Sequence, residues 1–159
     1  MRVTAKADYA VRACLELARH ADPALAGRTC RPLTGHSVAE AQAIPAKFLE
    51  GILADLRRSG IVRSQRGAEG GYRLARAAKE IAIADIIRAV EGPLADVRGI
   101  RPDALDWGGD LEVVQRMWVA VRASLRSVLE RVTLADLRDG QLPRLVDRMA
   151  DDPEAWAEH

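Results

Sequence analysis

Several arginines lie close in sequence to one glycine-rich stretch, residues 67–71, in the first half of the chain. Arg57 and Arg58 precede this stretch, and four more arginines flank it: Arg63, Arg66, Arg73 and Arg76. Guanidinium groups stay charged at neutral pH and bind phosphates through paired hydrogen bonds. Such a stretch can bind a nucleic acid, although surface arginines on any small domain would give the same local pattern. The surrounding sequence decides between these interpretations.

Acidic and basic residues are divided unevenly along the chain. Residues 1–78 hold 13 of the 24 Lys and Arg residues but only 7 of the 23 Asp and Glu residues. The formal net charge of +1 therefore hides a basic first half and an acidic second half. A basic surface attracts polyanions and an acidic surface repels them, so we expect the two halves to have different partners.

The residues that could support catalysis or bind a metal stand apart from one another. None of the three histidines, His20, His36 and His159, has a cysteine or carboxylate at the spacing of a metal site or catalytic triad. Cys14 falls among the core residues of a helix, and Cys30 falls in a loop that contains proline and glycine. No Gly-Lys-Ser/Thr follows the glycine-rich stretch, so it is not a phosphate-binding loop. The sequence predicts no enzyme, no metal site and no cofactor.

The chain also shows no sign of export. Two cysteines are too few for a disulfide framework, and no apolar segment is long enough for a secretory signal or a membrane span. We therefore expect a cytoplasmic protein without a membrane partner.

An amphipathic helix leads into the glycine-rich stretch. Pro45 suits the first position of a helix, where its missing N–H costs nothing. Gly60 is predicted to end the helix, because glycine adopts the left-handed conformation common at helix exits. Residues 61–66 and 72–75 then form two strands joined by the loop at residues 67–71. The apolar stripe of the helix consists of Phe48, Leu49, Ile52, Leu53 and Leu56.

Two further helices precede this one. Thr4 can cap a helix that runs through about Ala21. Ser37 and Glu40 form a capping box for a short helix that ends near Gln42 or Ala43. Two helices joined by a short turn, with a hairpin after the second, make a winged helix-turn-helix. The predicted fold class is mainly α with a small β-hairpin wing. The core face of the first helix consists of Ala7, Ala10, Val11, Cys14, Leu17 and Ala18.

Three segments of the chain read MRVTAKADYAVRACLELA, SVAEAQAIPAKFLEGILADLRRSGIVRSQRGAEGGYRLA and IAIADIIRAVEGPL. Together they resemble the Rrf2 (Rrf-two) family of bacterial winged-helix transcription regulators, which includes an iron–sulfur cluster regulator, a nitrite-sensitive repressor and a cysteine-metabolism repressor. The wing pattern RG-x-x-GGY and the later EGP stand at the family's spacing. The predicted division is a DNA-binding domain at residues 1–92, a linker at the family's sensor position at 93–110, and a dimerisation helix with C-terminal helices at 111–159. A helix bearing Ile83, Ile86, Ile87 and Val90, closed by Gly92-Pro93, ends the first domain.

The linker lacks a feature of the cluster-binding relatives, in which it supplies three cysteines. Residues 93–110 contain none. Arg98, Asp103 and Asp106 cannot replace the soft thiolates that iron–sulfur chemistry requires. Asp8 lies where some relatives recruit a further ligand, but a cluster would still need the linker cysteines. We expect no cluster, and a signal that is an unknown small molecule, a protein partner or a thiol reaction at one of the two cysteines.

A seven-residue apolar repeat follows the linker. Such a seam favours a second helix as partner, and the resemblance implies a homodimer through a long helix at residues 111–132. The alternative is packing against the chain's own domain, for which Val113, Met117 and Ala120 offer a second face. Shorter helices are predicted at residues 134–139 and about 142–150. The dimerisation seam consists of Leu111, Val114, Trp118, Val121, Leu125, Val128 and Val132.

The predicted function is a dimeric, sequence-specific regulator that binds double-stranded DNA at a palindromic operator, as a repressor. The recognition helix would present Lys47, Glu50 and Gly51 to base edges, and Glu50 could accept from a cytosine amino group or pair with nearby charges instead. The alternative is a winged-helix adaptor that binds proteins and no DNA. The remaining predicted contacts are phosphates for Arg57, Arg58 and Ser64, and the minor groove for Arg66 and Gly67.

Overall fold

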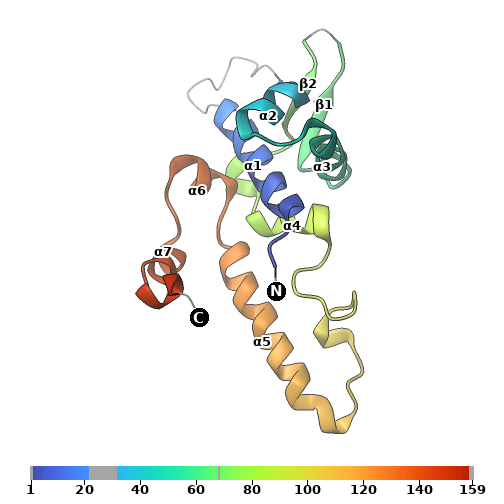
Figure 1. The fold of residues 1–159 in the computed structure, drawn as a ribbon, viewed down its shortest axis with the longest axis vertical. Coiled ribbons are helices and arrows are strands. Elements are labelled where there is room, and N and C mark those ends of the chain that lie inside the picture. Colours follow the sequence, from blue (N-terminus) through green and yellow to red (C-terminus); the bar gives the residue numbers. More distant parts are fainter. Residues whose placement is uncertain (1, 22–31, 68, 158–159) are drawn as a thin grey trace.

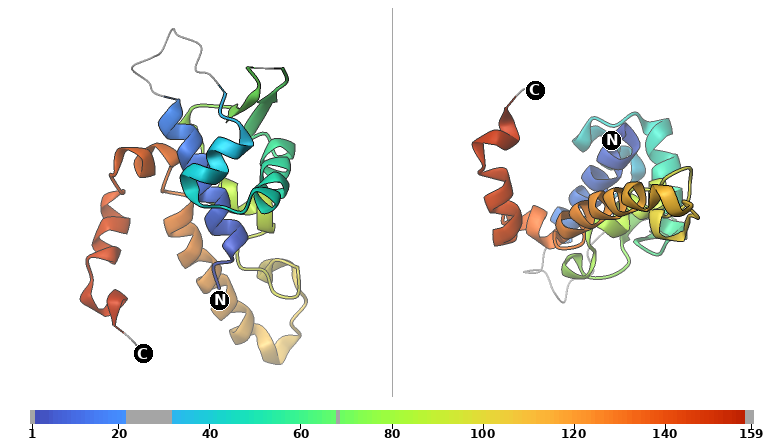
Figure 2. Two further views of the ribbon diagram at one scale, coloured as in Figure 1. Left: turned by 45° about the horizontal axis from the view of Figure 1, so that its top comes forward. Right: turned by 90° about the horizontal axis from the view of Figure 1, so that it is seen from below.

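The computed structural model describes residues 2–21, 32–67 and 69–157. A bundle of four helices carries a two-stranded hairpin at one end, and a long helix leads away from the bundle at the other end (Figure 1). Two shorter helices follow, and the first of them, α6, packs against the bundle (Figure 2). Within the described residues, no helix is long and apolar enough to cross a membrane.

Helix α1 (Ala5–His20) is the centre of the bundle. Its predicted cap is confirmed, because the Thr4 hydroxyl accepts a hydrogen bond from the Ala7 N–H at 3.0 Å. The small side chains on its core face let other helices approach closely, and α1 packs against α2, α3, α4 and α6. Five of the six predicted core residues of this helix are buried, and Val11 packs at the edge of the same cluster.

The helix-turn-helix consists of α2 (Gly35–Gln42) and α3 (Ala46–Arg58). The predicted capping box is wrong, because Thr34 and not Ser37 caps α2. The Thr34 Oγ1 accepts from the Ser37 N–H at 3.0 Å, which places Ser37 inside the first turn. The turn is short because Ala43 adopts a left-handed conformation with φ 50°, and Pro45 then starts α3 as predicted, to within one residue.

Four of the five stripe residues of α3 are buried in the core: Leu49, Ile52, Leu53 and Leu56. The fifth, Phe48, is wrongly predicted, since it is 44% exposed and packs edge-on against Tyr9 at 5.8 Å between ring centroids. Phe48 lies at the margin of the stripe, where α1 covers only one side of the ring. Gly60 has φ 73° directly after α3, as a helix exit in the left-handed conformation requires.

The wing is the antiparallel pair β1 (Val62–Gln65) and β2 (Gly71–Leu74). Its base is anchored by the buried Val62 and by Leu33, which exchanges two backbone hydrogen bonds with Tyr72. Gly71 is required there, because a Cβ at this position would lie 2.3 Å from the Leu33 carbonyl oxygen. This isolated β-bridge ties the wing to the entrance of α2.

Helix α4 (Ile83–Glu91) follows the 3₁₀ turn Ala78–Glu80 and packs across α1 and α3. After it, residues 93–110 form an irregular segment with the 3₁₀ turns Pro102–Ala104 and Gly109–Leu111. This linker is held to the next helix by side chains, since Arg122 donates to the Leu94 carbonyl at 2.6 Å and Gln115 donates to the Pro102 carbonyl at 3.2 Å.

Helix α5 (Glu112–Leu129) is shorter than the predicted seam. Val132 lies beyond its end and is 5% exposed within the chain's own core, where its carbonyl accepts from the Ile83 N–H at 2.9 Å. Its assignment to a dimerisation seam is therefore wrong. The heptad pattern continues past the helix because the same apolar spacing also serves the core of a single chain.

The C-terminal elements follow the prediction closely. Helix α6 (Leu134–Asp139) has the predicted bounds and is capped by Thr133, whose hydroxyl accepts from the Asp136 N–H at 3.2 Å. Helix α7 (Arg144–Ala150) begins after Pro143, and a final 3₁₀ turn, Pro153–Trp156, leaves the Trp156 side chain 79% exposed.

Candidate nucleic-acid interface

The outer face of α3 presents the predicted recognition residues to solvent. Lys47, Glu50 and Gly51 are exposed on the side of the helix away from its buried stripe. Glu50 forms no ion pair with any described residue, so the alternative of pairing with neighbouring charges is not realised there. A Cβ at Gly51 would meet nothing within 4 Å, which leaves a shallow opening in this face.

The two arginines at the end of α3 differ in their surroundings. Arg58 pairs with Asp55 at 3.0 Å, and Asp55 also pairs with Lys6 of α1 at 2.9 Å. The hydrogen bond from Lys6, together with Arg58, holds the pKa of Asp55 below its usual value. Arg57 has no ion-pair partner among the described residues. No local sequence pattern indicates this Lys6–Asp55 ion pair, because it joins residues far apart in the chain.

The wing carries exposed polar residues along its length. Ser64, Arg66 and Gly67 are all exposed, and Arg66 makes no ion pair with a described residue. Arg63 and Arg73 are exposed too and lie directly opposite each other across the strands. Arg76 differs, because it pairs at 3.4 Å with Asp85 of α4 and so belongs to the base of the wing.

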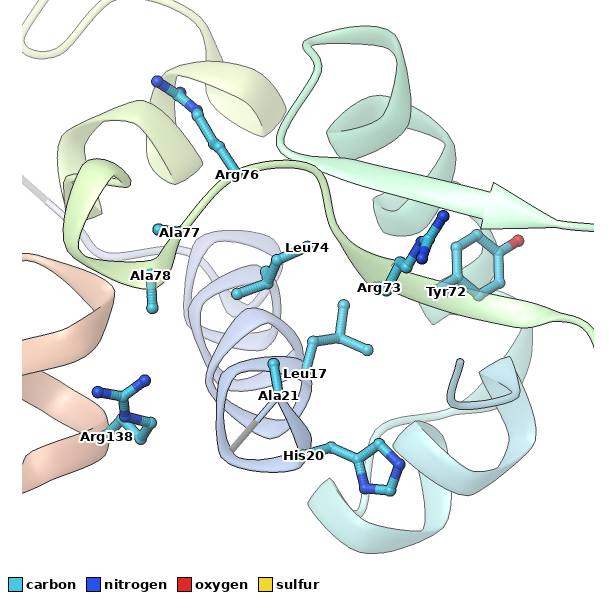
Figure 3. Close-up of a pocket in the computed structure, with 10 residues that line it drawn as sticks. All are labelled: Leu17, His20, Ala21, Tyr72, Arg73, Leu74, Arg76, Ala77, Ala78 and Arg138. Carbon is cyan, nitrogen blue, oxygen red and sulfur yellow. The ribbon is translucent and has the colours of Figure 1, made fainter. Parts of the chain in front are cut away.

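A cavity of about 320 Å³ lies at that base, between α1, β2 and α6 (Figure 3). Its walls are mainly apolar and include Leu17, Leu74 and Ala78, and Arg138 of α6 lies at its edge. Neither the cavity nor the approach of α6 to the wing base could be read from local patterns.

The described linker residues do not fit an iron–sulfur cluster. None of residues 93–110 is a cysteine, and three linker carboxylates are occupied locally: Asp96 accepts from the Gly99 N–H, Asp103 pairs with Arg101, and Asp106 accepts from the Gly108 N–H.

Cys14 is fully buried, and burial raises the pKa of its thiol to about 12. Asp8, the other ligand considered, pairs with Arg12 at 3.4 Å. Cys30 lies outside the described residues.

No group of three or more His, Cys, Asp or Glu side chains able to hold a metal occurs within the described part of the chain. What the described part does assemble is a short two-helix unit, an exposed polar face on its second helix and an adjacent basic hairpin. These features define a winged helix-turn-helix of the DNA-binding class.

Comparison with known proteins places the chain within this class. A sequence model described as "Rrf2: Iron-dependent Transcriptional regulator" matches residues 3–140. The chain is 47% identical over 155 residues to Rv1287 of Mycobacterium tuberculosis, a protein named as an HTH-type transcriptional regulator, and the match covers 98% of this chain and 92% of that protein. It is 32% identical over 158 residues to the HTH-type transcriptional regulator IscR of Yersinia enterocolitica, covering 99% and 92% respectively.

The fold is similar to that of CymR, the global cysteine regulator of Bacillus subtilis, with a TM-score of 0.71 and 28% identity over 89% of this chain and 98% of that one. The chain therefore belongs to the Rrf2 family and is a DNA-binding transcriptional regulator. The predicted family, the winged-helix fold class and a regulatory rather than enzymatic role are confirmed.

Proposed function

We propose that this regulator acts in the cytoplasm as a homodimeric repressor that binds a palindromic operator and carries no iron–sulfur cluster. The observation that supports DNA recognition best is the α3 face, where Lys47, Glu50 and Gly51 are exposed and free of ion pairs with described residues. Lys47 would bind a phosphate or guanine, and Glu50 would accept from a cytosine amino group.

The other contacts would position the protein on the duplex. Arg57, Arg58 and Ser64 would bind phosphates on either side of the major groove, and Arg66 beside Gly67 would enter the minor groove. Arg58 would have to share its charge with Asp55, so we expect Arg57 to contribute more of the phosphate binding.

Helix α5 supports the dimer. None of its residues is buried in the single chain. Val113, Met117 and Val119 are 78%, 48% and 39% exposed, so the second face, which the sequence offered for packing on the chain's own domain, is turned outward. A long helix with this much apolar surface is stabilised when a second copy covers it. The proposed seam comprises Leu111, Val114, Trp118, Val121, Leu125 and Val128. It is only half-buried or exposed, so part of it is available to a partner.

Selection of bound duplexes from a random pool tests this proposal. The expected result is one enriched sequence with two inverted half-sites about one helical turn apart, since a two-fold dimer places its recognition helices at that spacing. Retention of no duplex at low salt would contradict the proposal and favour a protein-binding adaptor instead. An absorption spectrum of anaerobically purified protein tests the absence of a cluster, and visible absorbance bleached by dithionite would contradict it.

A further inference from the structure

The outward face of the wing carries two arginines at the same level. The strand register pairs Arg63 of β1 with Arg73 of β2, and both side chains are exposed. Residues directly opposite in an antiparallel pair have Cβ atoms about 5 Å apart, and like charges at that distance destabilise the pair. The neighbouring cross-strand pairs, Val62 with Leu74 and Ser64 with Tyr72, point to the other face.

No carboxylate of the described chain compensates this pair. Neither Arg63 nor Arg73 forms an ion pair or side-chain hydrogen bond with a described residue. Some other arginines of the chain do pair with a carboxylate, one of them at the foot of the same hairpin. The arginines paired with a carboxylate are Arg12, Arg58, Arg76, Arg88, Arg101, Arg126 and Arg138. On the outward face of the wing, Arg63 and Arg73 therefore lie side by side without a neutralising carboxylate from the described chain.

We propose that Arg63 and Arg73 form a two-arginine clamp for one phosphodiester of the DNA backbone, one clamp on each wing of the dimer. This inference rests on the proposed DNA-binding function. A phosphodiester offers two unesterified oxygens with one shared negative charge, and each guanidinium can donate a pair of parallel hydrogen bonds to them. The anion would remove the like-charge repulsion that the free wing carries.

The clamp has a role different from that of Arg66. Arg66 follows the last residue of β1 and leads into the wing loop, whereas the clamp lies nearer the base of the hairpin. Phosphate contacts fix the depth and register of a protein on the duplex without reading sequence. The clamp would therefore hold the wing at the backbone while the loop enters the adjacent minor groove, and its loss should weaken binding to all duplexes by a similar factor.

The experiment measures the salt dependence of binding to the duplex obtained by selection, for the parent and three double variants. R63Q/R73Q removes the clamp, and R63K/R73K keeps its charge but not its fork geometry. R144Q/R148Q is the matched control, because it removes two exposed positive charges on α7 that have no ion-pair partner among the described residues. Thermal melting of each free protein is recorded in parallel.

The slope of log affinity against log salt should become less steep by about 2 in R63Q/R73Q, since each phosphate neutralised contributes roughly 0.9 and a dimer has two wings. The control should keep the parent slope. R63K/R73K should keep most of the slope but bind more weakly. The melting temperature of R63Q/R73Q should equal or exceed that of the parent, whereas a merely structural role for the arginines predicts a lower one.

Three results would overturn the clamp. The first is a parent slope in R63Q/R73Q, and the second is an equal loss of slope in R144Q/R148Q. The third is that millimolar inorganic phosphate at constant ionic strength stabilises the parent but not R63Q/R73Q, while the two proteins have the same slope. This result would assign the pair to a free anion. In each case the parent still binds the duplex, so the proposed function stands. If the parent binds no duplex, the function and the clamp both fail.

Discussion

Arg66 follows the last residue of β1, at the start of the wing loop, and no described carboxylate pairs with it. A guanidinium there is suited to the narrow, electronegative minor groove of A·T-rich DNA, which favours arginine over the more strongly hydrated lysine. Arg66→Ala should therefore weaken operator binding, and Arg66→Lys should restore only part of the loss.

Gel-shift titrations at fixed salt on operators with A·T-rich and G·C-rich flanks measure this effect. The Arg66→Ala loss should be larger on the A·T-rich flank, while the circular dichroism spectrum and sedimentation of the variant stay those of the parent. Equal affinities of parent and variant on both flanks would show that the wing loop does not read the minor groove.

Cys14 is a residue whose chemistry is set by burial. Its side chain is 0% exposed, and desolvation raises the thiol pKa from 9.0 to about 12. The folded state therefore favours the neutral thiol over the thiolate. The stability that depends on this neutral thiol is complete below pH 9, and it is lost as the pH rises from 9 towards 12. Since the thiolate is the reactive form, Cys14 should be inert to oxidants in the folded protein.

Titration with a disulfide reagent checks this prediction in the Cys30→Ser variant, which leaves Cys14 as the single thiol. The thiol should react slowly in native buffer at pH 8 and fully within minutes in denaturant. Fast reaction under native conditions would restore Cys14 as a candidate redox sensor.

Helix α3 contains a residue that lowers the stability of the fold. Gly51 lies in the middle of this helix, and a Cβ there would meet nothing within 4 Å. Gly51→Ala should raise the free energy of unfolding by about 1 kcal/mol, because alanine has the higher helix propensity. Gly60→Ala is a suitable contrast, since Gly60 has φ +73° and alanine there should destabilise the protein. Urea denaturation measures both, and a destabilised Gly51→Ala protein would contradict the open environment described for this position.

An ion-pair network joins α4 to the end of α5. Glu130 pairs with Arg126 at 2.9 Å and also with Arg88 of α4. The hydrogen bond from Arg126 has the largest effect on the Glu130 carboxylate and that from Arg88 the next. Together they lower the pKa of Glu130 from 4.5 to about 2. A depressed pKa means that the pair stabilises the fold above pH 4.5 and that this stabilisation is lost as the pH falls towards 2.

Glu130→Gln should therefore lower the melting temperature at pH 7, and the difference from the parent should shrink as the pH falls through this window. Glu112→Gln is the control, because Glu112 is exposed at the start of α5 and has no ion pair with a described residue. A difference that stays constant from pH 7 to pH 2 would mean that the charge of Glu130 is not what joins the helices.

The elements that could be predicted are those with strong local signals. The start of α6 followed from Thr133, and the wing followed from two short strand-like segments joined by a glycine-rich loop. The cap of α2 could not be chosen correctly, since Thr34 and Ser37 are both good caps three residues apart and tertiary packing selects between them. The same limit applies to Phe48, whose apolar character says nothing about how much of its ring α1 covers.

The candidate site likewise combines features that local sequence patterns predict with features that they do not. The exposed positions on α3 and the wing follow from helical and strand periodicity, so their residues could be named from sequence alone. The Lys6–Asp55 pair and the opposition of Arg63 and Arg73 depend on long-range contacts and strand register, which local patterns do not specify. The assignment of Val132 to the dimerisation seam was wrong for a related reason, because a heptad spacing does not tell whether an apolar residue faces its own core or a second chain.

At the scale of the whole molecule, the wing and the start of α5 lie at opposite ends (Figure 1). The bundle between them buries one continuous apolar cluster that includes Cys14, Leu56, Ile86 and Leu134. The exposed apolar surface of α5 lies away from this cluster. A second copy bound along α5 would therefore leave both recognition helices and both wings uncovered.

Sedimentation velocity of the protein alone and mixed with the selected operator duplex tests the proposed dimer on DNA. The free protein should sediment as a dimer at micromolar concentration, and one duplex should carry two chains. Leu125→Glu, on the proposed seam, should weaken both the dimer and the complex, because a single recognition helix contacts only one half-site. A free protein that stays monomeric, or a tight complex of one chain per duplex, would contradict the proposed dimeric regulator.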